Sequence, residues 1–278
     1  MGFGVKTLAK SALRFIKTKD VVPIDHVVSE RQILEGKVAL ISGGSGGIGM
    51  AIAKQFYNAG ALIVLGGTDA SKLQRCAEEI GPKTRVKAVL MDISNPNRAE
   101  QAVSEAMRMF GRIDIFVNSS GVHTNNVDLW NMTPEEFDRV FSINLRGAFF
   151  AGRAAANHMI EAGIKGHILF INSSRGFEPA WSPYGISKWG LRGMTQGFAQ
   201  KLLPYGITVN GIAPGSTATS LIGVADGDSI DSQENGVGRL ALPDEIATWA
   251  LMLVSSFGDM VVGETVLVSG GRGSIDIR

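Results

Sequence analysis

The chain has 278 residues, of which 45% are hydrophobic and 19% are charged, and its formal net charge is +1. This composition predicts a folded globular protein, and the near-zero charge excludes a strongly basic nucleic-acid-binding surface. A single cysteine, Cys76, excludes an internal disulfide and favours a cytoplasmic location, and the longest apolar runs are far shorter than the roughly 20 residues that cross a bilayer.

Residues 1–34 form an arm with a character of its own. Apolar residues recur at helical spacing between Val5 and Ile16, and five lysines and arginines precede the first acid, Asp20. This pattern predicts a basic amphipathic helix. We expect the helix to dock on the body of the protein or on a partner subunit, and contact with an anionic membrane surface is the alternative. We also expect the arm to be dispensable for chemistry.

From residue 35 onward, short β-branched runs alternate with segments of helical period. The runs that predict strands cover residues 38–42, 62–67, 85–90, 113–118, 167–172, 206–212 and 264–270. Helix-length segments, such as 47–60, 70–81 and 97–111, separate most of them, and strands joined by such crossovers pair in parallel. The pattern predicts a single α/β domain over residues 35–278, with a Rossmann-type doubly wound parallel sheet of about seven strands and helices on both faces.

A glycine-rich turn, "SGGSGGIG" at residues 42–49, joins the first predicted strand to the first helix. Gly43 lets the chain turn tightly off the strand, while Gly47 and Gly49 remove side chains where the backbone approaches a ligand and the helix packs on the sheet. The helix N-terminus adds free N–H groups and a partial positive charge, which suit the diphosphate of a dinucleotide. The alternative is a tight turn without a ligand.

The stretch "SPYGISKW", residues 182–189, places a tyrosine four residues before a lysine. On a helix the side chains of Tyr184 and Lys188 share a face, so their heads can converge on one ligand. A tyrosine pKa is ordinarily near 10, and we expect the nearby ammonium to lower it toward the range in which a general acid or base works at neutral pH. The alternative is an ordinary exposed helix surface.

Further motifs follow in the order found in the short-chain dehydrogenase/reductase family, which the sequence resembles over residues 36 to about 272. The glycine turn is similar to the family's TGxxxGxG, "NSSG" at 118–121 resembles its NNAG, and Tyr184 with Lys188 resembles its YxxxK. Residues similar to other family motifs are Asp92, Asn144, Ser173, Pro214, Gly215 and Thr219. Ser174 is the alternative to Ser173, which we prefer because Gly176 follows it three residues later. The chain is similar to 3-oxoacyl-carrier-protein reductase-like members.

The resemblance implies an enzyme that transfers hydride between a nicotinamide cofactor and a carbonyl or secondary alcohol substrate, without a metal. It implies that Tyr184 exchanges a proton with the substrate, that Ser173 hydrogen-bonds the reacting oxygen and that Lys188 holds the nicotinamide ribose. Asn144 would anchor a water that resupplies protons, and Asp92 would receive the adenine amino group. The implied cofactor-binding residues are Gly43, Ser45, Gly47, Ile48, Gly49, Gly67, Thr68, Asp92, Ile93, Asn118, Gly121, Tyr184, Lys188, Pro214, Gly215 and Thr219.

The end of the second predicted strand bears on the choice between the two nicotinamide dinucleotides. An acid there would accept from the ribose 2′-hydroxyl and repel a phosphate, but Gly67 occupies that position. Because this acid is missing, we expect a preference for NADP(H), with NAD(H) as the alternative. Two observations oppose that preference: no arginine follows at Thr68, and Asp69 would repel a phosphate.

The remaining expectations concern the substrate, the subunits and the rival function. Residues 216–240 lie where the family keeps a substrate lid and hold no cationic cluster for a strongly anionic substrate, so thioesters, cyclic alcohols and sugars all stay open.

Gly190, Gly193 and Gly197 fall on one helical face, which predicts close approach of another helix in a homodimer or homotetramer, with packing inside the chain as the alternative. A non-catalytic dinucleotide-binding sensor or scaffold is the rival function, and the complete catalytic set argues against it.

Overall fold

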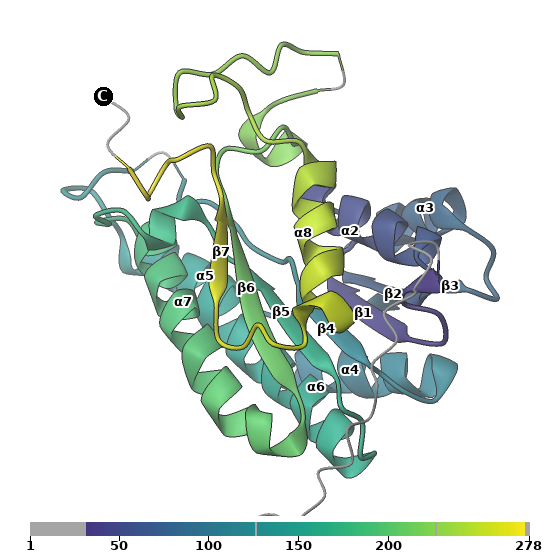
Figure 1. Cartoon of the computed structure of the whole chain (residues 1–278). Helices are drawn as coiled ribbons and strands as arrows, with labels where there is room; N and C mark the ends of the chain where they lie inside the picture. The colour runs from purple at the N-terminus through teal and green to yellow at the C-terminus, as the bar shows by residue number, and fades with distance from the viewer. Residues whose placement is uncertain (1–31, 126, 226, 276–278) are drawn as a thin grey trace, which may run out of the picture.

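Seven parallel strands form one sheet within the residues that the computed structural model describes, which are 32–125, 127–225 and 227–275. The strand order is β3-β2-β1-β4-β5-β6-β7, and Figure 1 shows helices on both faces of the sheet. The strands are β1 (Val38–Ser42), β2 (Leu62–Gly67), β3 (Val86–Leu90), β4 (Ile115–Asn118), β5 (His167–Ile171), β6 (Thr208–Pro214) and β7 (Thr265–Val268). The predicted Rossmann-type fold is confirmed, whereas the arm predicted over residues 1–34 lies almost wholly outside the described residues.

Helices connect the strands, as parallel pairing requires. The α-helices are α2 (Gly47–Asn58), α3 (Ala70–Ile80), α4 (Pro96–Phe110), α5 (Pro134–Phe141), α6 (Ala148–Glu161), α7 (Pro183–Leu202) and α8 (Pro243–Leu253). A π-helix, η2 (Ser142–Gly147), joins α5 to α6, and the short 3₁₀ helices are η3 (Ser174–Gly176), η4 (Leu203–Tyr205), η5 (Ser220–Ile222) and η6 (Ser256–Gly258). None of the helices in the described part of the chain combines the length and the apolar character that a membrane crossing requires.

Each face of the sheet carries its own hydrophobic core, because the side chains of a strand alternate between the two faces. On β1, Ala39 and Ile41 belong to the core that includes residues of α2, α3 and α8. Val38 and Leu40 belong to the opposite core, which includes residues of α4, α6 and α7. All of β1 is buried, as a strand covered on both faces should be. The two cores give the carboxyl edge of the sheet a rigid base.

The direction in which strands are added reverses between β1 and β4, which are neighbours in the sheet. The strands β2 and β3 extend from β1 on one side, and β5, β6 and β7 extend from β4 on the other. In open α/β sheets, the carboxyl ends of the strands beside such a reversal form a crevice for ligands. The last residues of β1 and β4, Ser42 and Asn118, are register partners at that edge.

Side-chain caps fix the starts of two helices at this edge. The Ser182 hydroxyl accepts from the Gly185 N–H at 3.2 Å where α7 begins. Asp69 accepts from the Lys72 N–H at 2.9 Å where α3 begins. The start of α2 differs, because within the described residues it has neither a side-chain cap nor an acid in its first turn. The first turn of α2 therefore offers N–H groups to an anionic ligand.

Candidate active site

A cleft of about 440 Å³ opens beside the glycine turn, at the carboxyl edge of the sheet. Most of the residues predicted to bind a dinucleotide line it. These residues are Gly43, Ser45, Gly47, Ile48, Gly49, Gly67, Thr68, Asp92, Ile93, Gly121, Tyr184, Lys188 and Thr219. The fold thus brings the glycine turn, the ends of β2 and β3 and the first turns of α7 around one space, which we name the cofactor cleft.

Three glycines of the turn have no room for a side chain. Gly43 has a φ of +68°, and a Cβ there would lie 2.8 Å from the backbone of Ser119. A Cβ on Gly49 would lie 2.2 Å from the carbonyl oxygen of Gly43. A Cβ on Gly47 would lie 2.5 Å from the side chain of Thr219. The bare turn and the uncapped start of α2 form a cradle that fits the diphosphate of a dinucleotide.

Asn118, although predicted to bind the cofactor, does not line this cleft. Its side chain is buried at the end of β4, where Oδ1 accepts from the Ser42 hydroxyl at 2.6 Å. Ser120 stands where the NNAG motif has alanine, and its hydroxyl donates to the Ser42 hydroxyl at 3.1 Å. Because Ser42 and Asn118 face each other in register, their side chains pair with each other. Asn118 is therefore a positioning residue that supports the strand ends below the turn.

Asp92 lies after β3 and contributes a carboxylate to the cofactor cleft. Its Oδ1 accepts from the N–H and the hydroxyl of Ser94, at 3.0 and 2.6 Å. Its Oδ2 lies 4.0 Å from the guanidinium of Arg98, and its side chain is 35% exposed. The carboxylate is thus held in one orientation and can accept a hydrogen bond from an amino group in the cleft.

A second cleft, of about 540 Å³, adjoins the cofactor cleft. The residues that line both clefts are Ile48, Asn172, Tyr184, Thr219 and Leu221. Ser173 and Trp181 line the second cleft but not the cofactor cleft. The same holds for Pro214 and Gly215, which were predicted to bind the cofactor. The shared residues place Tyr184 where ligands in either cleft can reach it.

The pKa of Tyr184 is raised, contrary to the prediction. Burial raises the pKa of the phenol, while the Ser173 side chain and the charges of Arg175 and Arg272 oppose the rise. The expectation that Lys188 lowers this pKa is wrong here, because desolvation of the phenolate outweighs the charges around it.

Lys188 lies one turn further along α7 and is 5% exposed. Its Nζ donates to the carbonyl oxygen of Ile171 at 3.0 Å and lies 5.6 Å from the centre of the Tyr184 ring. Burial lowers the pKa of the amine to about 8. The end of β5 therefore holds the lysine in the wall of the cofactor cleft, and its amine is mainly protonated at neutral pH.

Asn144 lies in the π-helix η2 and lines neither cleft. Its Oδ1 accepts from the N–H of Val122 at 2.8 Å, and its Nδ2 donates to the carbonyl oxygen of Val122 at 2.9 Å. The Nδ2 also donates to the hydroxyl of Ser187 at 3.3 Å. Asn144 thus ties the segment after β4 to α7. The water-anchoring role that the resemblance implies stays a prediction.

His123 is a site residue that the sequence did not reveal. Its imidazole stacks on the Tyr184 ring, with the ring centres 4.2 Å apart and the planes at 20°. Burial lowers the pKa of His123, and the charges of Lys188 and Arg175 lower it further, so the ring is neutral at pH 7. The only available signal was its place two residues after Gly121.

An ion pair holds the segment that carries His123. The carboxylate of Glu136 accepts from the Asn125 N–H at 2.6 Å and from the Arg139 guanidinium at 2.7 Å. Arg139 also donates to the carbonyl oxygen of His123 at 2.7 Å. The Arg139 and Asn125 hydrogen bonds lower the pKa of Glu136 to about 2. The Glu136–Arg139 ion pair, which holds this wall of the second cleft from behind, therefore stays charged throughout the neutral pH range.

Asn172 and Lys72 are further lining residues that the sequence did not reveal. Asn172 accepts from the Ser173 N–H at 3.0 Å through Oδ1, and its buried Nδ2 has no partner among the described residues. An unpaired buried amide between two clefts suits an acceptor atom on a ligand. Lys72, in the first turn of α3, lines the cofactor cleft together with Gly67 and Thr68.

A family model and several known proteins match most of this chain. The family model described as short chain dehydrogenase matches residues 37–227. An acetoacetyl-CoA reductase from Acinetobacter sp. (strain RA3849) is 36% identical over 245 residues, which cover 85% of this chain and 98% of the relative. A 3-ketoacyl-(acyl-carrier-protein) reductase from Brucella melitensis, solved in complex with NADH, has a TM-score of 0.78 at 34% identity and covers 86% of this chain and 99% of its own. A short chain dehydrogenase from Burkholderia cenocepacia J2315, solved in complex with NADP, has a TM-score of 0.79 at 32% identity and covers 87% of this chain and 100% of its own.

Proposed function

Since the chain belongs to the short-chain dehydrogenase/reductase family and is an oxidoreductase acting on CH–OH or C=O groups, we propose that Tyr184 is its general acid and base. The position of the phenol carries this proposal, because Tyr184 lies where the cofactor cleft meets the second cleft. A nicotinamide dinucleotide, when bound in the cofactor cleft, supplies or accepts the hydride. The second cleft then receives the carbonyl or alcohol substrate.

Tyr184 and Ser173 act on the same substrate oxygen. Because burial raises the pKa of the phenol, Tyr184 keeps its proton at neutral pH and donates it to the carbonyl oxygen during reduction. The Ser173 hydroxyl donates to that oxygen and holds it beside the phenol. In the oxidising direction the phenol must first lose its proton, so that direction gains rate as the pH rises. Ser174 lines the same cleft but begins η3, and Ser173 is the serine whose side chain acts on the pKa of the phenol.

The cofactor cleft favours NADP(H) over NAD(H). The end of β2 presents Gly67 instead of an acid, and the cation of Lys72 belongs to the same lining. Asp69, which would oppose a phosphate, is engaged as the cap of α3 by the Lys72 N–H and the Ser71 hydroxyl. Lys188 would hold the ribose hydroxyls from the buried wall. Measuring kcat/KM with both cofactors tests this preference, and an advantage of about tenfold for NAD(H) would contradict it.

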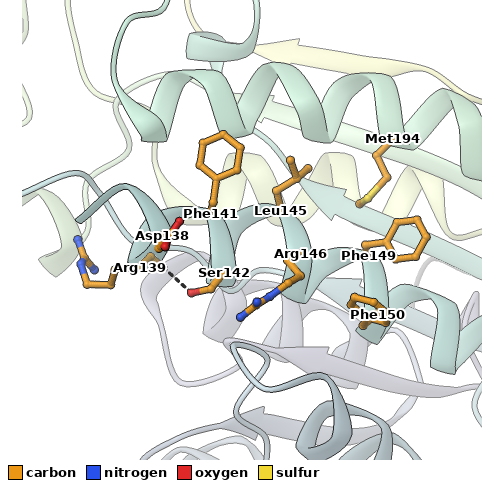
Figure 2. Close-up of a pocket in the computed structure, with 9 residues that line it drawn as sticks. All are labelled: Asp138, Arg139, Phe141, Ser142, Leu145, Arg146, Phe149, Phe150 and Met194. Atoms are coloured by element: carbon orange, nitrogen blue, oxygen red, sulfur yellow. Dashed lines mark hydrogen bonds between the residues drawn. The ribbon is translucent and has the colours of Figure 1, made fainter. Parts of the chain in front are cut away.

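The chain forms a homodimer or homotetramer through the face made by α5, η2, α6 and α7. A groove of about 910 Å³ lies on this face. Figure 2 shows its lining residues, with Met194 of α7 pointing toward Phe149 of α6. The groove is lined by Asp138, Arg139, Phe141, Ser142, Leu145, Arg146, Phe149, Phe150 and Met194. Phe149 is 41% exposed although its ring packs edge-on against Phe198. An apolar groove of this kind supports a contact with a second copy.

The glycines of α7 support the same contact, but only in part. A Cβ on Gly190 would lie 2.9 Å from Leu145, so packing inside the chain explains this glycine. At Gly193 and Gly197, no described atom beyond the chain neighbours and the nearby backbone of α7 lies within 4 Å of such a Cβ. A glycine inside a helix costs about 1 kcal/mol relative to alanine, and a partner helix approaching the bare stretch would offset that cost. Sedimentation velocity at micromolar concentration tests the contact, and a stable monomer would contradict it.

Residues 216–240 act as the lid of the second cleft. The residues of this segment that line the cleft are Ser216, Thr217, Thr219, Leu221, Ile222, Glu234 and Leu240. Figure 1 shows the segment projecting beyond β6 and α8.

We place the protein in the cytoplasm, because its single cysteine, Cys76, forms no disulfide and gives no reason for an oxidising compartment. Cell fractionation tests the location.

Turnover of a panel of ketones and alcohols, followed at the nicotinamide absorbance, tests the assignment of Tyr184. Tyr184→Phe keeps the ring that stacks on His123 and removes only the hydroxyl. We expect kcat to fall by at least about 10²-fold, with the fold intact, because general acid–base catalysis contributes that much. Tyr205→Phe is the matched control, since Tyr205 is 55% exposed and lines neither cleft. Full activity in Tyr184→Phe would remove the assignment.

A further inference from the structure

Four charged side chains meet at the part of the second cleft that the cofactor cleft does not share. They come from segments that lie far apart in the sequence. Arg175 and Glu178 follow β5, Glu234 belongs to the lid segment, and Arg272 follows β7. Arg175, Glu234 and Arg272 line the cleft itself. The substrate cleft therefore contains cations, although the lid segment has no cationic cluster of its own.

Arg272 holds the group together and is 17% exposed. Its Nε donates to Oε1 of Glu178 at 2.8 Å, and its Nη1 donates to Oε2 of Glu234 at 2.6 Å. The hydroxyl of Ser269 donates to the carbonyl oxygen of Arg272 at 2.6 Å and fixes the turn after β7. The backbone that carries Arg272 is thus fixed, and its guanidinium has two different carboxylate partners.

The two carboxylates differ in how firmly they are held. Glu178 is 18% exposed and also accepts from Arg175 at 3.0 Å, so the two arginines share it. Glu234 is 55% exposed and reaches Arg272 from the lid segment. If Glu234 turned away, two guanidiniums would share one carboxylate, and the wall of the cleft would carry a net positive charge. Glu234 is therefore the exchangeable partner of Arg272.

The position of the Glu234 carboxylate shows which chemical group fits here. One oxygen, Oε2, accepts from both the Arg272 guanidinium and the Ser216 hydroxyl. A carboxylate on a ligand in the cleft would meet the same two donors, and guanidinium–carboxylate hydrogen bonds are strong and directional. Arg272, Ser216 and Tyr184 line the same cleft, so one ligand can contact both this wall and the phenol.

Building on the function proposed above, we propose that Arg272 and Ser216 form a subsite for a carboxylate group of the substrate, and that Glu234 occupies the subsite in its absence. The substrate class is then an oxo or hydroxy carboxylate. Arg239, the cation within the lid segment, does not belong to the subsite, because it forms a paired salt bridge with Glu245 at 2.7 and 2.8 Å.

The test compares oxo carboxylates of increasing chain length with their methyl esters. The measured quantity is the ratio of kcat/KM for the acid to kcat/KM for the ester, with the nicotinamide cofactor saturating. In Glu234→Gln the competing charge is gone, and we expect the ratio to rise about fivefold over wild type through a lower KM for the acid. Asp231→Asn removes the same charge from the same segment without touching Arg272, so its ratio should stay within about twofold of wild type.

A second measurement does not depend on turnover. Calorimetric titration with hexanoate and with hexanamide should show tighter binding of hexanoate in Glu234→Gln than in wild type, and weaker binding in Arg272→Lys. An unchanged acid-to-ester ratio in Glu234→Gln, or an equal rise in Asp231→Asn, would overturn the subsite. If hexanoate binds as expected while neither acids nor esters are turned over, the subsite stands and the proposed function fails.

Discussion

Replacing Lys188 with methionine should change how the stability of the protein depends on pH. The side chain is 5% exposed, and burial lowers the pKa of its amine from 10.5 to about 8. A buried lysine with a lowered pKa lowers the free energy of unfolding. This penalty is complete below the pKa of the folded state and fades as the pH rises toward the pKa of the unfolded state. The gap between the two pKa values corresponds to about 3 kcal/mol. Methionine has a similar shape and no charge, so Lys188→Met carries no such penalty.

Between pH 7 and pH 9, wild type should therefore gain about 1 kcal/mol of unfolding free energy relative to Lys188→Met. The assay is urea unfolding of both proteins at fixed protein concentration and at several pH values across this window. Lys201→Gln is the control, because Lys201 is an exposed lysine of the same helix, and its offset from wild type should not vary with pH. A wild-type and Lys188→Met difference that is constant across the window would refute the reasoning.

Variants at four further residues test the roles described above. Lys72→Ala should lower the kcat/KM ratio of NADP(H) to NAD(H) by about fivefold, the effect of one exposed cation on a phosphate, and an unchanged ratio would show that another group binds the phosphate. His123→Ala should have a kcat about fivefold below that of His123→Phe, which keeps the ring stacked on Tyr184, and equal values would contradict a role for the stack. Gly193→Glu should still fold, because a Cβ at this position has open space beyond its own helix. It should sediment as a monomer, because the new side chain would block the partner helix. Gly190→Ala should instead lower stability without changing association, because its Cβ would meet Leu145.

Local sequence patterns predicted the inner strands because β1, β2, β4, β5 and β6 are almost wholly buried on both faces. The runs at 38–42 and 62–67 coincide with β1 and β2, since continuous apolar character and adjacent glycines mark both ends. The glycine turn was equally readable, because Gly43 needs a positive φ and Gly49 has no space for a Cβ. The strand near residue 115 starts later than predicted, although the backbone of Asp114, just before β4, already forms hydrogen bonds with Val38 and His167 of the neighbouring strands.

The rest of the site depends on contacts that no local pattern contains. The Arg272 and Glu178 pair joins residues 94 positions apart, so the cationic wall of the second cleft was invisible in the lid segment. The stack of His123 on Tyr184 requires the segment after β4 and the start of α7 to meet. The direction of the Tyr184 pKa shift depends on burial, which spacing along a helix does not report. The sequence therefore indicated which residues gather, but not which interactions dominate among them.

The two ends of the cofactor cleft tolerate change very differently. A single methyl group at Gly49 would stand 2.2 Å from a carbonyl oxygen, whereas at Gly67 it would make ordinary contact with Leu73 at 3.4 Å. The end of the cofactor cleft at the glycine turn is thus closed to larger side chains. The end at Gly67 has room for a side chain, so substitutions can change the lining there without any change to the turn.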